Sequence, residues 1–214
     1  MHGLLKHLHG GDQHSHAGAA PQTTGSVIHW ASRYDGVVQV MALGQAGRLR
    51  RATVEFAQIT SGERVLDVGC GTGDLTLLAK ERAGSAGQVC GLDAAPEMIE
   101  VARQKAARKH ADVDFRAGFI EQLPYPDASF DVVLSSLMMH HLPADLKPLA
   151  LAEIRRVLRR ADAVSGKPNG RLVIVDFRGL LEQQQVAALV EQAGFTQVET
   201  RRLWFNVLGL LRAA

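Results

Sequence analysis

The stretch Val65-Leu66-Asp67-Val68-Gly69-Cys70-Gly71-Thr72-Gly73 decides the fold class, because an apolar run typical of a buried strand leads directly into a glycine-rich turn. The residues from Asp74 to Glu81 then carry a helical pattern. Glycines let the backbone of such a strand–turn–helix unit approach a ligand where a Cβ atom would clash. The stretch therefore predicts an α/β protein with a ligand site at the end of this strand.

Outward from this stretch, short apolar runs alternate with helical patterns. Strands are predicted at Arg64–Val68, Gln88–Asp93, Val113–Arg116, Phe130–Leu134 and Arg171–Asp176, and helices at Asp74–Glu81, Pro96–Lys109, Leu146–Arg159 and Leu180–Gln192. Such alternation is typical of right-handed βαβ units. Two more strand-like runs, Gln197–Arg201 and Leu203–Leu208, are expected to form an edge hairpin. The prediction is a Rossmann-like, mostly parallel seven-stranded sheet with an antiparallel edge hairpin and helices on both faces.

The chain has 214 residues, which fits one domain. Residues 1–25 are rich in His and Gly and predict a flexible tail, with metal chelation by its histidines as the alternative. Residues 26–214 form the single predicted domain. Within it, helical spacing over about 27–59, interrupted at Gly44 and Gly47, predicts two helices that act as an N-terminal lid.

Composition and sequence pattern argue against several classes of protein. Lys and Arg total 24 against 22 Asp and Glu, a balance that does not indicate a nucleic-acid-binding protein. Cys70 and Cys90 lack metal-type spacing, so we expect neither a disulfide framework nor a metal site. No apolar run is long enough to span a membrane and the N-terminus does not resemble a secretory signal, so we expect a cytoplasmic protein. The apolar segment from Leu203 to Leu211 is read as an edge strand, or as a peripheral membrane contact.

Two carboxylates limit the kinds of ligand that this site can bind. Asp67 lies beside the glycine turn, where it would repel a pyrophosphate by about 4 kcal/mol at 4 Å and an effective dielectric near 20. Asp74 also stands where the dinucleotide fingerprint has its third glycine. Asp93 ends the next strand, where a carboxylate accepts hydrogen bonds from ribose hydroxyls. A nucleoside with a cationic amine and no phosphate would suit both carboxylates, and S-adenosylmethionine is such a molecule. The alternatives are that Asp67 caps the turn and that Asp93 caps the helix starting at Pro96.

Residues 30–212 resemble the class I S-adenosylmethionine-dependent methyltransferases. Besides the glycine turn, the resemblance rests on the run from Gln122 to Val133, on His140-His141-Leu142, on Glu153–Leu158 and on Ala193-Gly194-Phe195. Within the class, the chain looks most similar to the ubiquinone and menaquinone biosynthesis methyltransferases and their type 11 relatives.

The resemblance implies where the cofactor binds. We expect it to contact Asp67, Gly69, Cys70, Gly71, Gly73, Asp93, Ala94, Met98, Gly118, Phe119, Ile120 and Ser135. Phe119 departs from the family pattern, which has an acidic residue there for the adenine amino group, and we expect it to contact the adenine ring instead. The resemblance also implies that Tyr34, in the predicted lid, closes over the methionine end of the cofactor.

Residues that follow the strand ending near Leu134 are expected around the transferred methyl group. His140 or His141 is the predicted base, with His140 favoured because it is nearer the strand. The alternative is that they cap the helix beginning near Pro143 or pack beside it. The expected acceptor is a small apolar or aromatic molecule, similar to a quinone precursor. A lipid-amine or other N-methyltransferase, and a non-catalytic binding module, are the rival functions. The expected assembly is a monomer or homodimer.

Overall fold

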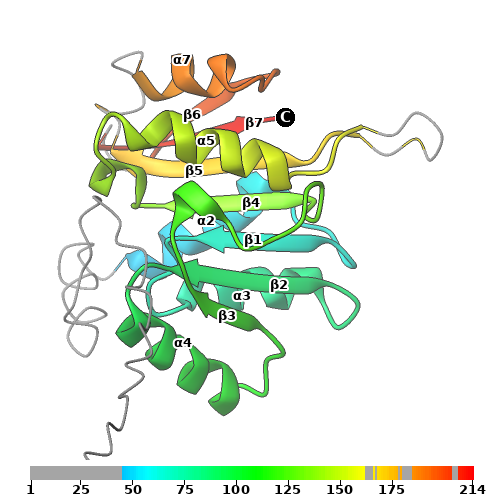
Figure 1. The fold of residues 1–214 in the computed structure, drawn as a ribbon. Helices are drawn as coiled ribbons and strands as arrows, with labels where there is room; N and C mark the ends of the chain where they lie inside the picture. The colour runs from blue at the N-terminus through cyan, green and yellow to red at the C-terminus, as the bar shows by residue number, and fades with distance from the viewer. Residues whose placement is uncertain (1–44, 162–165, 167, 178, 180–184, 204–206) are drawn as a thin grey trace, which may run out of the picture.

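The computed structural model describes residues 45–161, 166, 168–177, 179, 185–203 and 207–214 (Figure 1). The predicted tail and the part of the predicted lid that contains Tyr34 lie outside these residues. Within the described ranges, no helix is long and apolar enough to cross a membrane.

Seven strands form one sheet in the order β3-β2-β1-β4-β5-β7-β6. These are β1 Arg64–Val68, β2 Gln88–Asp93, β3 Asp114–Ala117, β4 Val132–Ser136, β5 Arg171–Phe177, β6 Glu199–Leu203 and β7 Leu208–Ala213. The first five pair in parallel, and β7 runs antiparallel to both β5 and β6. The strand order reverses between β1 and β4, which is the place where open α/β sheets bind ligands at the carboxyl ends of their strands. The predicted sheet is confirmed.

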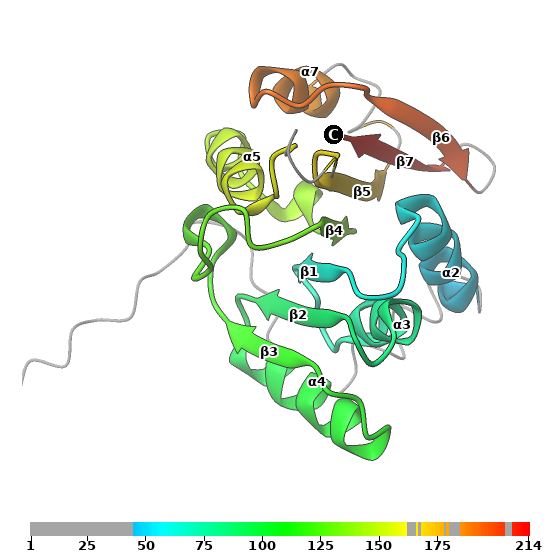
Figure 2. The same ribbon diagram turned by 90° about the vertical axis from the view of Figure 1, so that its right-hand side faces the viewer.

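Helices cover both faces of the sheet, as predicted (Figure 2). One face carries α2 (Ala46–Ala57), α3 (Asp74–Ala83) and α4 (Pro96–Arg108), and the other carries α5 (Leu146–Val157) and α7 (Gln185–Gln192). Because the central strands are covered on both sides, the apolar residues of β1, β4 and β5 are buried almost without interruption. The polar exceptions, Asp67, Ser135 and Asp176, lie at or near the carboxyl ends of these strands.

The edge hairpin is confirmed, but its second strand was predicted too early. Leu203 and Leu208 are paired across the β6–β7 ladder, so they belong to different strands rather than to the predicted strand Leu203–Leu208. The prediction placed the reversal of the chain before Leu203, whereas the strand pairing places it between Leu203 and Leu208. Phe130 was likewise assigned to β4, which starts at Val132; Phe130 instead forms an isolated bridge with Leu158.

The helix α2 is the part of the predicted lid that the structure describes. Gly47 lies within this helix and does not interrupt it. Leu49, Val54 and Phe56 bury their side chains in the core formed with α3, β5 and β7. This half of the predicted lid therefore packs on a face of the sheet.

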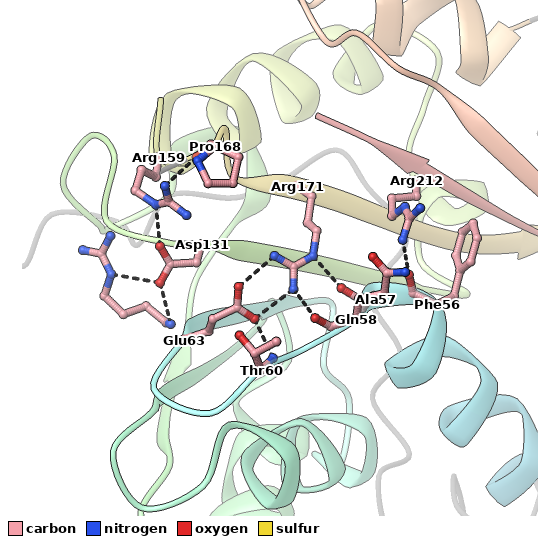
Figure 3. A network of polar contacts seen from close by, with 11 residues as sticks. Phe56, Ala57, Gln58, Thr60, Glu63, Asp131, Arg159, Pro168, Arg171 and Arg212 are labelled. Atoms are coloured by element: carbon pink, nitrogen blue, oxygen red, sulfur yellow. Dashed lines mark hydrogen bonds and ion pairs between the residues drawn. The ribbon is translucent and has the colours of Figure 1, made fainter. Parts of the chain in front are cut away.

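Arg171, the first residue of β5, fastens α2 to the sheet (Figure 3). Its guanidinium donates to the backbone oxygens of Ala57 and Gln58, which lie at the C-terminus of α2, and both of its terminal nitrogens donate to the Glu63 carboxylate at 2.8 Å. A cation at this end of a helix also complements the helix dipole. Burial raises the pKa of Glu63, but the bonds from Arg171 and Thr60 outweigh it, so the net pKa is lowered.

Replacing Arg171 with Ala should destabilise the protein by about 2 kcal/mol, because a half-buried carboxylate and two carbonyl groups lose charged donors. Arg171→Lys should restore little of this, since one ammonium cannot reproduce the planar fork. The measurement is the free energy of unfolding in urea. Arg116→Ala is the control, because its ion pair with Asp114 is exposed and should contribute only about 0.5 kcal/mol. Equal losses in the two Ala variants would contradict this role of Arg171.

Candidate active site

The glycine-rich turn follows β1 and is tied to the end of β2. The backbone N–H groups of Gly69 and Cys70 both donate to the carbonyl oxygen of Leu92, at 2.8 and 3.0 Å. Gly69, Gly71 and Gly73 have φ values of 69°, 53° and 81°, in the left-handed region that favours glycine. The backbone conformation of the turn is therefore one reason for the glycines, and the predicted close approach of the turn to a ligand stays a prediction.

Close packing is a second reason for two of these glycines. A Cβ atom added to Gly69 would lie 2.3 Å from Cγ of Met138, and one added to Gly73 would lie 2.7 Å from Cζ of Phe115. The turn is thus enclosed between the segment after β4 and the core under α4. Cys70 is buried within it, and burial raises the pKa of its thiol well above the ordinary value, so this cysteine stays protonated.

Asp93, the last residue of β2, holds the turn from the other side. Its Oδ2 accepts the Gly71 N–H at 2.8 Å and its Oδ1 accepts the Ala95 N–H at 2.9 Å. The second bond supports the start of α4, although Ala95 rather than Asp93 is at the N-cap position. Burial raises the pKa of Asp93, and the backbone N–H groups oppose that rise. Each oxygen keeps acceptor capacity, so the carboxylate can still bind two hydroxyl groups.

Asp67 is buried inside β1 and is only 1% exposed. The hydroxyl of Thr76, on α3, donates to it at 2.6 Å. Burial raises the pKa of Asp67 to about 7; the Thr76 bond and the charge of Arg50 oppose the rise, while the charge of Asp93 adds to it. The carboxyl therefore connects the strand to the helix on the far side of the turn.

A carboxylate also occupies the start of α3. Asp74 pairs with Lys105 of α4 at 2.8 Å and with Arg50 of α2 at 3.0 Å, and Lys105 donates to the Thr72 hydroxyl as well. In dinucleotide-binding turns the helix N-terminus receives the pyrophosphate. Here the side chain of Asp74 takes that position and pairs with both cations.

The segment after β3 lies beside Asp93. The Gly118 N–H donates to the Asp93 carbonyl oxygen at 2.9 Å, and Phe119, which is half-buried, precedes the short 3-10 helix η1 (Ile120–Gln122). Ile120 is buried in the core. The structure thus brings Gly118 to the end of β2, and Phe119 is the next residue in the chain.

The segment after β4 also lies at the carboxyl ends of the parallel strands. Leu137 has a φ of 53°, an unfavourable conformation for a residue with a Cβ atom, and its N–H donates to the Val175 carbonyl oxygen of β5 at 2.7 Å. This sharp bend brings Met138 against Gly69. Ser135, at the end of β4, is fully buried, and its hydroxyl has no hydrogen-bond partner.

His140 and His141 follow in the 3-10 helix η2 (Met139–His141), and their rings stack with centroids 4.0 Å apart. The alternative that they cap a helix is wrong, because α5 begins at Leu146 and has Asp145 at its N-cap position. Nδ1 of His140 instead lies 2.8 Å from Oδ1 of Asp176, which is fully buried at the end of β5. Burial lowers the pKa of His141, with a further lowering from the charge of His140.

A family model described as a methyltransferase domain matches residues 65–161, which run from β1 to just beyond the end of α5. A demethylmenaquinone methyltransferase from Deinococcus radiodurans is 42% identical over 147 residues, which are 69% of this chain and 56% of the relative. A ubiquinone/menaquinone biosynthesis C-methyltransferase from Teredinibacter turnerae is 32% identical over 163 residues, 75% of this chain and 61% of the relative. The chain belongs to the class I S-adenosylmethionine-dependent methyltransferases.

Solved methyltransferases share this fold. The crystal structure of an S-adenosylmethionine-dependent methyltransferase from Aquifex aeolicus superimposes with a TM-score of 0.66 at 21% identity, covering 82% of this chain and 96% of that one. The matches to the curated relatives span only 56% and 61% of those relatives' lengths. The similarity to them therefore concerns the methyltransferase domain more than the whole proteins.

The geometry of the site fits the cofactor of this family. The turn leaves no room for side chains at Gly69 and Gly73, and Asp93 keeps free acceptor positions. Of the other predicted contacts, Ala94 adjoins Asp93 and is half-buried, whereas Met98 is buried in α4 with 2% exposure. Their contacts with the cofactor, like those of all the other predicted cofactor-binding residues, stay predictions.

One residue of the methyltransferase site was missed. Asp176 was noted only as the end of a predicted strand, yet it contacts the predicted base directly. The signal was present, because Asp176 ends a strand of the parallel sheet just as Asp93 does, and the carboxyl ends of parallel strands lie at one edge.

Replacing Asp67 with Asn should stabilise the methyltransferase relative to wild type more at about pH 8 than at about pH 5. The folded-state pKa of about 7 lies above the ordinary value of 3.8, so the contribution of this carboxyl to stability is complete below about pH 4 and is lost as the pH rises through 7. Asn carries no charge and can still accept the Thr76 bond. Urea unfolding of both proteins at the two pH values is the measurement, with exposed Asp112→Asn as the control. A gain that is the same at both pH values would contradict the raised pKa.

Proposed function

We propose that this chain transfers a methyl group from S-adenosylmethionine to a ring carbon of a small aromatic hydroquinone. The observation that carries the proposal is the His140 ring, held by Asp176 next to the segment that packs on the glycine turn. The names of the relatives support the acceptor class, since they are demethylmenaquinone and ubiquinone/menaquinone C-methyltransferases.

The cofactor half of the site follows from the residues described above. The Asp93 carboxylate accepts the ribose hydroxyls, the Asp67 charge attracts the ammonium group, and the Phe119 ring contacts the adenine. When bound, S-adenosylmethionine supplies an electrophilic methyl group, and the electron pair of the broken S–C bond returns to the sulfur. The chain's own contribution is to align the two reactants and to keep water away.

The acceptor half favours an aromatic molecule with a hydroxyl group. A ring carbon becomes nucleophilic when a neighbouring hydroxyl gives up its proton, and a neutral imidazole takes such a proton near neutral pH. One aromatic side chain beside the His140 ring is accessible to an acceptor, because the Phe177 ring meets it edge-on at 4.9 Å and is itself 42% exposed. A hydroquinone suits this arrangement, whereas the oxidised quinone has no hydroxyl proton and an electron-poor ring.

Calorimetric titration tests the cofactor half. Wild type should bind S-adenosylmethionine and S-adenosylhomocysteine, and Asp93→Asn should weaken both by tenfold or more, about 1.4 kcal/mol, because one acceptor oxygen is lost. Asp112→Asn is the matched control on an exposed carboxylate and should bind as wild type. NAD should not bind. Absence of binding to folded wild type would overturn the proposal.

Product analysis tests the acceptor half. Wild type supplied with S-adenosylmethionine should methylate the ring of a short-chain prenylated naphthohydroquinone, and should leave the oxidised naphthoquinone unchanged. Phosphoethanolamine serves as the amine acceptor in a parallel reaction. Methylation of the amine and not of the hydroquinone would replace this proposal with the N-methyltransferase alternative.

A further inference from the structure

The buried carboxylate of Asp176 is joined to His140 by two bonds. Oδ1 lies 2.8 Å from Nδ1 of the ring, and Oδ2 accepts the backbone N–H of the same residue at 3.2 Å. Oδ1 also accepts the Phe177 N–H at 2.8 Å. One side chain from β5 thereby fixes both the ring and the backbone of the turn that carries it.

This arrangement selects a tautomer. A carboxylate oxygen accepts hydrogen bonds, so the short contact places the imidazole proton on Nδ1 and the lone pair on Nε2. The His140 side chain is 27% exposed while Asp176 is fully buried, so the ring reaches from the buried carboxylate toward the surface of the site. An imidazole held in this way is ready to accept a proton on Nε2.

The same contact distinguishes the two histidines. Of the titratable groups in the described part of the chain, Asp176 on β5 and His141 on η2 are the ones recorded beside the His140 ring. Asp176 bonds His140 and not His141. The hydrogen bond that fixes the orientation of a ring is therefore made to His140 alone of the two histidines.

We infer that Asp176 is a positioning residue that holds His140 as the Nδ1–H tautomer and makes Nε2 the atom that receives the acceptor's hydroxyl proton. The inference rests on the proposed function for the identity of the acceptor. In this step the O–H bond breaks, its electron pair stays on the oxygen and flows toward the ring carbon, and a new N–H bond forms on Nε2. The positive charge that appears on the imidazole lies against the Asp176 carboxylate.

Histidine-ring nitrogen NMR of the full chain tests the tautomer without any acceptor. The His140 signals are identified by their loss in His140→Gln. In wild type, Nδ1 of His140 should carry the proton while the ring is neutral. In Asp176→Asn a single oxygen must serve the donors that two carboxylate oxygens served, and the amide N–H can itself donate to Nδ1, so the Nε2–H tautomer should become populated.

Steady-state kinetics with the hydroquinone tests the consequence. His140→Gln should lower kcat about a hundredfold and Asp176→Asn about tenfold, with the KM for S-adenosylmethionine within about twofold of wild type, because neither residue holds the cofactor. His110→Gln is the matched control, since it removes an exposed histidine that follows the C-terminus of α4, and its kcat should stay within about threefold of wild type.

A purely structural role of Asp176 makes different predictions. It would lower the free energy of unfolding in Asp176→Asn while leaving the His140 tautomer as in wild type, and that result would overturn the inference. An Nε2–H tautomer in the wild-type protein would also overturn it. If the tautomer changes as expected but no hydroquinone is methylated, Asp176 keeps its positioning role and the acceptor class of the proposed function is wrong.

Discussion

The contact between the glycine turn and the end of β2 is the constraint on which the rest of the site depends. Two N–H groups of the turn share the Leu92 carbonyl oxygen, and a third, that of Gly71, meets the Asp93 carboxylate. Because Gly69 has no side chain, Met138 packs directly on the turn, and the segment after β4 is drawn toward it. The candidate base at His140 therefore takes its place relative to the cofactor-binding turn through backbone packing.

The parallel sheet concentrates acidic side chains at one edge. Asp67, Asp93 and Asp176 come from three different strands, and each is satisfied in a different way: by a hydroxyl, by backbone N–H groups, and by a histidine ring with backbone N–H groups. Burial would otherwise make such carboxylates costly. Their different partners suit the three for different tasks at the same edge.

Much of this arrangement was predictable from sequence, and the reasons are local. The glycines after Val68 and the carboxylate that ends β2 follow a strand–turn–helix pattern whose residues are close together in the chain. The pairing of His140 with Asp176 was not predictable in the same way, because it depends on β4 lying beside β5 and on the bend at Leu137. The boundary at Leu208 was misplaced because Leu203–Leu208 was read as one apolar strand, although Asn206, a residue type common in turns, interrupts the run.

The hydrogen bonds from Arg171 to the C-terminus of α2 affect how the domain folds. One of them joins residues that are 114 positions apart, since the carbonyl of Ala57 at the end of α2 is reached from the start of β5. Contacts of such long range bear the cost of closing a large loop before they bring any gain, and they slow folding. During synthesis α2 and α3, which pack on each other, emerge long before β5, so the part of the apolar face of α2 that packs on β5 and β7 stays uncovered until those strands are made. The interval before Arg171 arrives is therefore the period in which the nascent chain most needs protection from aggregation.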